Sequence, residues 1–216
     1  MTKCMLLGAV VLAFLPSLAG AGVTYQYDDG TAETYGGVGA NMYLAWMVRY
    51  AVQPGGEQVH DVRICLPAAV PCEAVVWEDI GGHGDPADAR VLSRTPFTGV
   101  TGWNTIPMTP VTVSGYFFVG AYNYGASAPM NGDSEGYQEH RSWLSADAND
   151  LDLNRLTAAP YYGWFEDFDP PIAYVAMVRA QATPEPATLV FLAAGSIAVI
   201  VRRTRNKEQN SPCTKG

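Results

Sequence analysis

The stretch that best indicates the fold is residues 105–122, TIPMTPVTVSGYFFVGAY. Val111 and Val113 alternate with polar residues, Ser114-Gly115 interrupts the run, and aromatic and β-branched residues follow. Alternation with a period of two, broken by a turn residue, is typical of antiparallel β-strands. The stretch therefore predicts two strands, Thr105–Val113 and Tyr116–Tyr122.

Similar strand signals fill the chain between residues 22 and 183, where no window of ten or more residues shows a helical stripe. Clusters of Gly, Pro, Asn and Asp separate the signals, as turns do. The other expected strands are Val23–Tyr27, Tyr43–Val52, Gln58–Leu66, Ala74–Glu78, Ala89–Ser93, Ser142–Ala146, Tyr161–Phe165 and Ile172–Ala182. This pattern predicts an all-β fold, a single antiparallel β-sandwich of jelly-roll-like type.

Residues 1–21 have the layout of a secretory signal peptide. Lys3 precedes the apolar stretch Met5–Leu15, and Ala19-Gly20-Ala21 supplies the small residues that signal peptidase accepts. A membrane-spanning helix is the alternative, but the apolar run of 11 residues is too short to cross a bilayer. We expect signal peptidase to cut after Ala21 and leave Gly22 first.

The C-terminal region, residues 183–205, combines a Pro-Glu-Pro motif, an uncharged run of 15 residues and a basic cluster. These parts are Pro184, Glu185 and Pro186, then Ala187–Val201, then Arg202, Arg203 and Arg205. Arginines after an apolar helix stay in the cytoplasm, which places the preceding domain outside the inner membrane. The sequence thus predicts a transmembrane helix over 187–201 and a cytoplasmic tail over 206–216.

This order of motif, apolar helix and arginines resembles the PEP-CTERM sorting signal of Gram-negative bacteria. The resemblance implies recognition by an exosortase, a membrane cysteine protease that would cut near Pro184–Pro186. The protein would then be anchored transiently and end in the cell envelope or the extracellular matrix. The tail from Asn206 to Gly216 is longer than is usual for such signals. An ordinary C-terminal anchor that is never cut is the alternative.

Residues 22–182 remain as one extracytoplasmic domain of ordinary size. Between residues 22 and 183 the chain has 19 acidic residues, 7 arginines and no lysine, a net charge of −12. Such a charge keeps an exported protein soluble and argues against nucleic acid as a partner. An acidic polysaccharide would need a bridging cation.

Two cysteines, Cys65 and Cys72, lie in this domain on either side of a turn with two prolines. An even pair in an oxidising compartment predicts a structural disulfide that closes the small loop. The spacing excludes a CxxC redox site, and the absence of a nearby His pair makes a zinc site improbable.

Four segments in order resemble a β-sandwich module found in many secreted bacterial proteins. They are 27–33 (YDDGTAE), 75–79 (VVWED), 97–105 (FTGVTGWNT) and 113–120 (VSGYFFVG). The resemblance implies the fold more than the function, because the module has no established catalytic activity.

Acidic turns raise the question of a calcium ion, which binds six to eight oxygen ligands. The candidate carboxylates are Asp28, Asp29, Glu78, Asp79, Asp147, Asp150 and Asp152. Their spacing matches no EF-hand, and Asp also favours turns for its own hydrogen bonds. The sequence therefore does not decide whether a metal ion is bound. Structural calcium is a minor alternative, and no cofactor is expected.

Aromatic residues near the end of the domain suggest sugar binding. Tyr161, Tyr162 and Trp164 precede Asp167 and Asp169, so rings that stack on sugars lie close to carboxylates that accept bonds from hydroxyls. Trp77 and Trp103 end expected strands and could contribute. Any one of these rings could instead fill the sandwich core, where aromatic side chains bury the most surface.

Catalytic patterns are weaker. The chain has three histidines, His60, His83 and His140, in no metalloprotease spacing. The sequence around Ser127 only half resembles a nucleophile elbow. Glu166 and Asp167 could serve a glycosidase only at a separation that sequence cannot show.

These observations predict an exported, exosortase-processed, non-enzymatic surface or matrix protein with a structural or adhesive role. A carbohydrate-binding module for extracellular polysaccharide is the main alternative, and a glycoside-degrading enzyme is a remote one.

Overall fold

The computed structural model describes residues 22–125 and 129–185, and this part of the chain is all-β. The strands pair antiparallel throughout. The helical segments described are three-residue 3-10 turns at Pro86–Asp88, Leu156–Ala158 and Phe165–Asp167. The prediction of an all-β fold built from antiparallel sheets is confirmed.

The strands are β1 (Val23–Tyr25), β2 (Thr34–Gly36), β3 (Tyr43–Ala51), β4 (Gln58–Leu66), β5 (Pro71–Asp79), β6 (Ala89–Thr98), β7 (Gly102–Thr112), β8 (Tyr116–Tyr124), β9 (Met130–Asp133), β10 (Ser142–Asp147), β11 (Tyr161–Trp164), β12 (Val175–Ala176) and β13 (Val178–Thr183).

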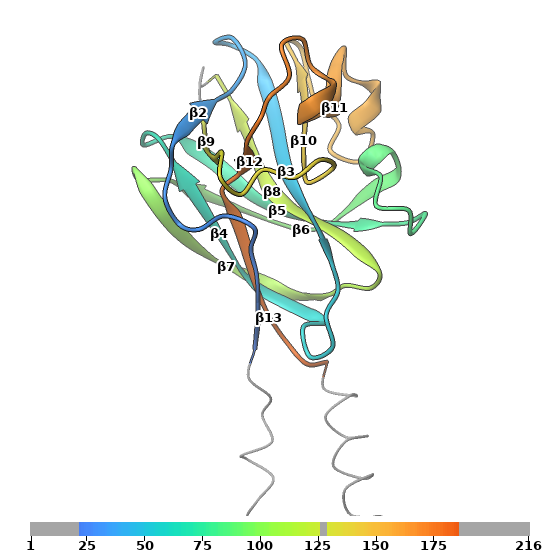
Figure 1. Cartoon of the computed structure of the whole chain (residues 1–216). Helices are drawn as coiled ribbons and strands as arrows, with labels where there is room; N and C mark the ends of the chain where they lie inside the picture. The colour runs from blue at the N-terminus through green and yellow to red at the C-terminus, as the bar shows by residue number, and fades with distance from the viewer. Residues whose placement is uncertain (1–21, 126–128, 186–216) are drawn as a thin grey trace, which may run out of the picture. The chain divides into compact units, whose positions relative to one another are not determined.

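Three sheets organise these strands. One has the order β1-β13-β4-β7, a second has β11-β10-β3-β8-β5-β6, and a small third has β12-β9-β2. The chain crosses between the first two sheets from β4 to β5, from β6 to β7 and again from β7 to β8 (Figure 1). Many neighbouring strands, such as β3 and β8 or β4 and β13, therefore come from distant parts of the sequence.

Alternating side chains divide the core into two clusters, one on each face of the six-stranded sheet. The larger contains Leu44, Trp46 and Val48 of β3 together with Val62, Ile64 and Leu66 of β4. The second contains Ala45, Met47 and Trp77, covered by Leu151, Leu153 and Leu156. Strand residues alternate between faces, so successive residues of β3 serve both clusters.

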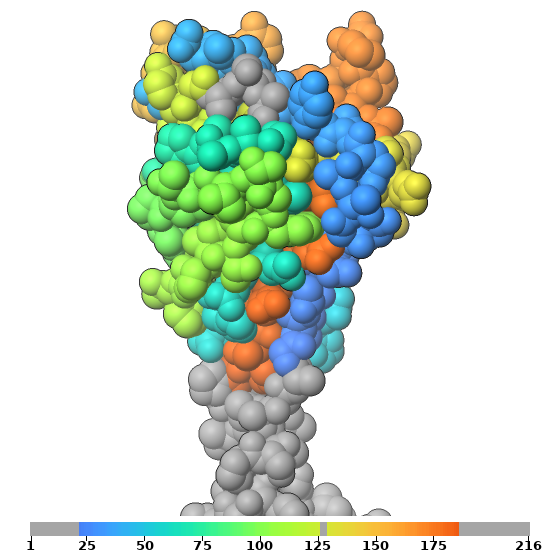
Figure 2. Space-filling view, turned by 90° about the vertical axis from the view of Figure 1, so that its left-hand side faces the viewer, coloured from blue at the N-terminus to red at the C-terminus, as the bar shows by residue number. Residues whose placement is uncertain are grey.

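The first and last strands of the domain lie side by side. Val23 of β1 pairs with Ala182 of β13, and Thr183 pairs with Gln58 of β4. Both strands run to the same end of the domain, as the adjoining blue and orange surfaces in Figure 2 show. The chain therefore enters and leaves the fold at one place.

The prediction of a disulfide between Cys65 and Cys72 is wrong, because both residues are buried free cysteines. Cys65 lies in β4 between two core residues, Ile64 and Leu66, so its side chain points away from the core. Cys72 lies in β5, in the other sheet, and points into the core. The two sulfurs have different neighbours, because the Asn131 amide contacts Cys65 Sγ at 3.2 Å and the Asn123 amide contacts Cys72 Sγ at 3.7 Å.

The signal peptide over 1–21, Pro186, the helix over 187–201, Arg202, Arg203, Arg205 and the tail all lie outside the described residues. Within 22–125 and 129–185, no helix has the length and apolar character that a membrane crossing needs.

Candidate functional site

The three aromatic residues predicted to bind a ligand do not share one surface. Tyr161 and Tyr162 are 58% and 48% exposed, whereas Trp164 is only 8% exposed. In β11, Tyr162 lies opposite Ser145 and Tyr161 lies opposite Ala146, a residue of the larger core. The two tyrosines therefore point to opposite faces of an edge strand and cannot stack together on one sugar chain.

Trp164 is part of the packing. Its ring makes an edge contact with Trp143 at 5.3 Å between centroids, and the Arg49 guanidinium lies 5.2 Å from it. Trp77 is fully buried, and its indole N–H donates to the Leu153 carbonyl at 2.9 Å. Two guanidiniums pack against the Trp103 ring, that of Arg63 at 5.3 Å and that of Arg179 at 4.3 Å from its centroid. Trp77 and Trp164 therefore pack in the core, as the alternative to sugar binding predicted.

A different aromatic cluster lies on the outer face of the six-stranded sheet. We call Tyr43, Tyr122 and Tyr124 the tyrosine cluster. Tyr43 of β3 lies 4.3 Å from Tyr124 and 6.1 Å from Tyr122 between ring centroids, and both partners belong to β8. Tyr124 is 53% exposed. Sequence reasoning missed this cluster because its members meet only when β3 pairs with β8.

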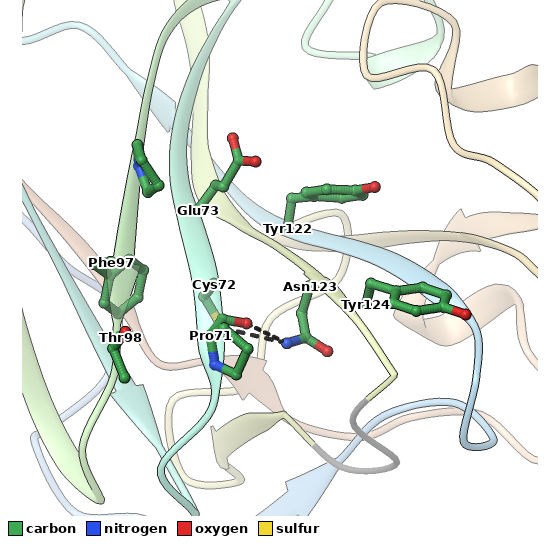
Figure 3. Close-up of a pocket in the computed structure, with 9 residues that line it drawn as sticks. Pro71, Cys72, Glu73, Phe97, Thr98, Tyr122, Asn123 and Tyr124 are labelled. Atoms are coloured by element: carbon green, nitrogen blue, oxygen red, sulfur yellow. Dashed lines mark hydrogen bonds between the residues drawn. The ribbon is translucent and has the colours of Figure 1, made fainter.

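An open groove of about 630 Å³ adjoins two of these rings. Three residues from each of three strands line it: Pro71, Cys72 and Glu73 of β5, Pro96, Phe97 and Thr98 of β6, and Tyr122, Asn123 and Tyr124 of β8. Figure 3 shows the two tyrosine rings on one side, Phe97 and Thr98 on the other, and Glu73 between them. The volume is in the range of small-molecule sites.

Polar contacts make one wall of the groove rigid. The Asn123 amide nitrogen donates to the Pro71 carbonyl at 2.6 Å and approaches the Cys72 sulfur at 3.7 Å. Asn123 is 1% exposed, so this amide holds β8 against the start of β5. A fixed wall lowers the entropy lost when a ligand is bound.

Charge in the groove is largely balanced. Glu73 accepts a hydrogen bond from Arg94, and that guanidinium lies 6.0 Å from the Tyr122 ring. Burial, with added effects of Tyr43, Asp150 and Glu73, raises the pKa of Tyr122 to about 12. The Tyr122 hydroxyl therefore stays neutral and can donate to a ligand oxygen at any physiological pH.

The groove lies at the end of the domain opposite the chain ends. Thr183 pairs with Gln58 at the start of β4, whereas Pro71 follows Leu66 at the end of β4. Gln58 and Leu66 are eight positions apart along β4, which is about 26 Å at about 3.3 Å per residue. A ligand in the groove would thus be held far from the point where the chain leaves the domain.

Among the described residues, two groups of side chains bring possible metal-ligand atoms close to one another. They are Asp29, Glu33 and Asp133, and Asp79, His83 and Asp88, each with ligand atoms within 4.8 Å of one another. Both Asp133 oxygens accept backbone N–H bonds, from Asp29 and Gly136 at 2.7 Å each. Glu33 accepts the Ser134 backbone N–H at 3.0 Å and Asp29 accepts that of Thr31 at 2.7 Å, so each carboxylate of the first group has a backbone partner.

The third acidic stretch is not gathered into such a group. Asp147, Asp150 and Asp152 each accept a bond from a backbone N–H one or two residues later in the chain. They act as turn residues whose side chains bond to the nearby backbone, which is the alternative to a calcium site.

The carboxylates weighed for glycosidase chemistry also have local roles. A Glu166 oxygen accepts the His140 backbone N–H at 2.6 Å, and an Asp167 oxygen accepts the Trp164 N–H at 3.2 Å. His60 contacts its neighbour Asp61 at 2.9 Å. Ser127 lies outside the described residues. Hydrogen bonds within the fold thus account for the positions of the Glu166, Asp167 and His60 side chains.

No family model matches the sequence, and no curated protein matches it. Among solved structures, the clostridial cysteine protease Cwp84 after propeptide cleavage matches with a TM-score of 0.53 and 10% identity, over 76% of this chain and 40% of that one. A structure of the cysteine protease and lectin-like domains of Cwp84, a surface-layer-associated protein of Clostridium difficile, matches with a TM-score of 0.47 and 10% identity, over 66% and 32%. This chain thus spans less than half of each structure, and the first match indicates a shared fold alone.

Proposed function

We propose that this chain is an exported, non-enzymatic surface or extracellular-matrix protein that adheres to polysaccharide through the groove beside the tyrosine cluster. The observation that carries the proposal is the exposed Tyr124 ring next to an open groove with few, fixed polar groups. Flat rings stack on the apolar faces of sugars, and the Glu73 carboxylate and the Tyr122 hydroxyl are groups that bond to sugar hydroxyls. A concave site with this mixture is typical of ligand binding.

The strand order supports the jelly-roll-like sandwich that we infer for the domain. In a jelly roll the chain alternates between two four-stranded sheets. Here β1-β13-β4-β7 faces β3-β8-β5-β6, and β10 and β11 extend the second sheet at its β3 edge. Lectin domains are among the proteins that use this architecture, although a fold by itself does not specify a ligand.

The groove supports binding more than hydrolysis. Glycosidases use two carboxyl groups about 5–9 Å apart across the sugar. Glu73 is the one carboxylate among the nine lining residues, and it is paired with Arg94. The remote alternative of a glycoside-degrading enzyme therefore gains no support from this groove.

Export and anchoring remain part of the proposal. Signal peptidase would remove residues 1–21, and an exosortase would act at Pro184, Glu185 and Pro186 before a helix over 187–201. Arg202, Arg203 and Arg205 would hold that helix in the inner membrane until cleavage. Thr183, the last residue before the Pro-Glu-Pro motif, pairs with Gln58 at the end of β4 that lies about 26 Å of strand from Leu66.

The test is affinity electrophoresis of the exported protein in gels containing soluble neutral polysaccharides such as dextran, laminarin and hydroxyethyl cellulose. We expect at least one of them to retard the native protein and Tyr124→Ala to weaken the retardation by about 2- to 10-fold, since aromatic stacking contacts are worth about 0.5–1.5 kcal/mol. Tyr161→Ala is the matched control, because Tyr161 is equally exposed but lies away from the groove.

Two results would contradict the proposal. One is a Tyr124→Ala protein that migrates like the native protein in every retarding gel. The other is a loss of retardation in Tyr161→Ala alone, which would return the site to the 161–164 segment. Hydrolysis of the gel polysaccharide would contradict the non-enzymatic role.

A further inference from the structure

The connection between β5 and β6 gathers a second set of functional side chains, away from the groove. Asp79 ends β5, His83 lies in the Gly-rich turn, and Asp88 ends the 3-10 segment Pro86–Asp88. One ligand atom from each lies within 4.8 Å of the other two. We propose that these three side chains bind a divalent transition-metal ion, with Zn²⁺ the best fit.

Asp79 is held in place by the turn that follows it. Its two oxygens accept the backbone N–H groups of Gly82, at 2.8 Å, and Gly84, at 2.5 Å. Each carboxylate oxygen has a second lone pair, so these bonds orient the group without using up its capacity as a ligand. Ligating carboxylates in metal sites are commonly oriented by such hydrogen bonds.

Asp88 provides an independent indication of a cation. The residue is half-buried; its Oδ1 atom is shielded from solvent and has no hydrogen-bond partner, while its Oδ2 atom is the oxygen that lies beside His83 Nδ1 at Gly81. Within the described part of the chain, neither Asp88 nor Asp79 forms an ion pair. The nearest guanidinium identified at this turn, that of Arg49, donates instead to the Gly84 carbonyl at 3.2 Å. A buried carboxylate oxygen without a partner is costly, and a bound cation would remove that cost.

Gly81 leaves the space that the site requires. A Cβ atom at residue 81 would lie 2.3 Å from Asp88 Oδ2 and 2.3 Å from His83 Nδ1. Both ligand atoms therefore converge on the position that glycine leaves free. A side chain at residue 81 would push the two ligands apart.

The donor set selects the class of metal. Calcium and magnesium prefer oxygen ligands, whereas an imidazole nitrogen favours Zn²⁺ and other transition ions. Three protein ligands that leave one position open for water are the number found in open zinc sites. Eight residues of β5 separate Asp79 from Pro71, about 26 Å of strand, so this site stands apart from the groove and does not depend on the proposed function.

Calorimetric titration of the purified full-length chain with ZnCl₂ tests the proposal. Cys4 and Cys213 are replaced with Ser in every sample, because terminal thiols would bind zinc themselves. We expect one equivalent of Zn²⁺ per chain, and an affinity reduced by more than about 10-fold in both His83→Ala and Asp88→Asn. His60→Ala, which removes a histidine outside the site, should bind as the parent does.

Thermal unfolding gives a second reading. Zn²⁺ should raise the Tm of the parent, since a ligand that binds only the folded state stabilises it, and should leave the Tm of His83→Ala unchanged. His83 is exposed, so this variant should match the parent in EDTA and remain folded. No zinc binding in the parent, or equal zinc binding in parent, His83→Ala and Asp88→Asn, would overturn the proposal.

Discussion

At the scale of single residues, the buried ion pair between Arg179 and Asp28 ties β13 to the segment after β1. The Arg179 Nε lies 3.0 and 3.2 Å from the two Asp28 oxygens, and the side chains are 12% and 1% exposed. The same guanidinium packs 4.3 Å from the Trp103 ring centroid. Since water reaches Asp28 so little, Arg179 is the group that compensates its charge.

We expect Arg179→Gln to lower the free energy of unfolding by about 3–5 kcal/mol, because it leaves a buried carboxylate without its cation. Urea denaturation would measure the change. The control is Arg94→Gln, whose partner Glu73 lies on the surface side of β5; an exposed pair of this kind should contribute about 1 kcal/mol or less. Equal losses in the two variants would refute the assignment.

The cysteines give a prediction that separates a free thiol from a disulfide. Burial raises the pKa of Cys72 to about 12, and it also raises the pKa of Cys65. The thiolate is the reactive form, so iodoacetamide at pH 8 should label both residues at least about 100-fold more slowly in the native protein than in guanidinium chloride. Peptide mapping would measure the rates, and a linked 65–72 peptide would contradict the free-thiol structure.

The residues that form the groove show why part of the site escaped sequence analysis. Tyr161 and Tyr162 stand out as consecutive letters, but consecutive strand residues point to opposite faces. Tyr43 and Tyr124 are 81 positions apart in the sequence and become neighbours through the β3–β8 register. Such a contact depends on which strands pair, and local patterns carry no information about that choice.

At the scale of elements, β3 and β8 approach one another closely at Gly120. A Cβ atom there would lie 1.9 Å from the Trp46 carbonyl oxygen and 2.7 Å from the Met47 Cα. Both obstacles are backbone atoms, so a rotamer change cannot relieve the contact. The pairing that builds the tyrosine cluster therefore requires glycine at this position.

We expect Gly120→Ala to destabilise the domain by about 1–3 kcal/mol, the usual cost of overpacking, through separation of β3 from β8. Chemical denaturation would report it, and the separation should also weaken polysaccharide retardation. Gly39→Ala is the control, because a Cβ atom at residue 39 meets no atom within 4 Å. A Gly120→Ala protein as stable as Gly39→Ala would show that the strands can move apart freely.

Strand positions were largely predictable, since they depend on local composition. The expected strand Gln58–Leu66 matches β4, and Tyr43–Val52 differs from β3 by one residue. The expected strand Ala89–Ser93 was too short, because β6 continues to Thr98 through Pro96. Proline has no N–H to give to a ladder, but β6 is an edge strand, where a missing donor is tolerated.

At the scale of the whole molecule, the fold closes on itself by pairing its two ends. β1 is the edge strand of its sheet and pairs only with β13 in the described structure, and β13 in turn pairs with β4. Ala180 and Ala182 of β13 are fully buried in the larger core. The last strand thus supports both the first strand and the core, and it ends at Thr183, just before the Pro-Glu-Pro motif.

This closure predicts where the chain can be cut without loss of the fold. A protein of residues 22–184 keeps every strand, so its Tm should lie within about 2 °C of that of the full chain. A protein of residues 22–179 loses Ala180, Ala182 and the pairing with β1, and its Tm should fall by more than about 10 °C. Calorimetry would compare the Tm values of the three proteins. The intact mass of the native exported protein would show at which residue its C-terminus lies. A stable 22–179 protein would mean that β13 does not close the fold, whereas a stable 22–184 protein is what cleavage at Pro184–Pro186 requires.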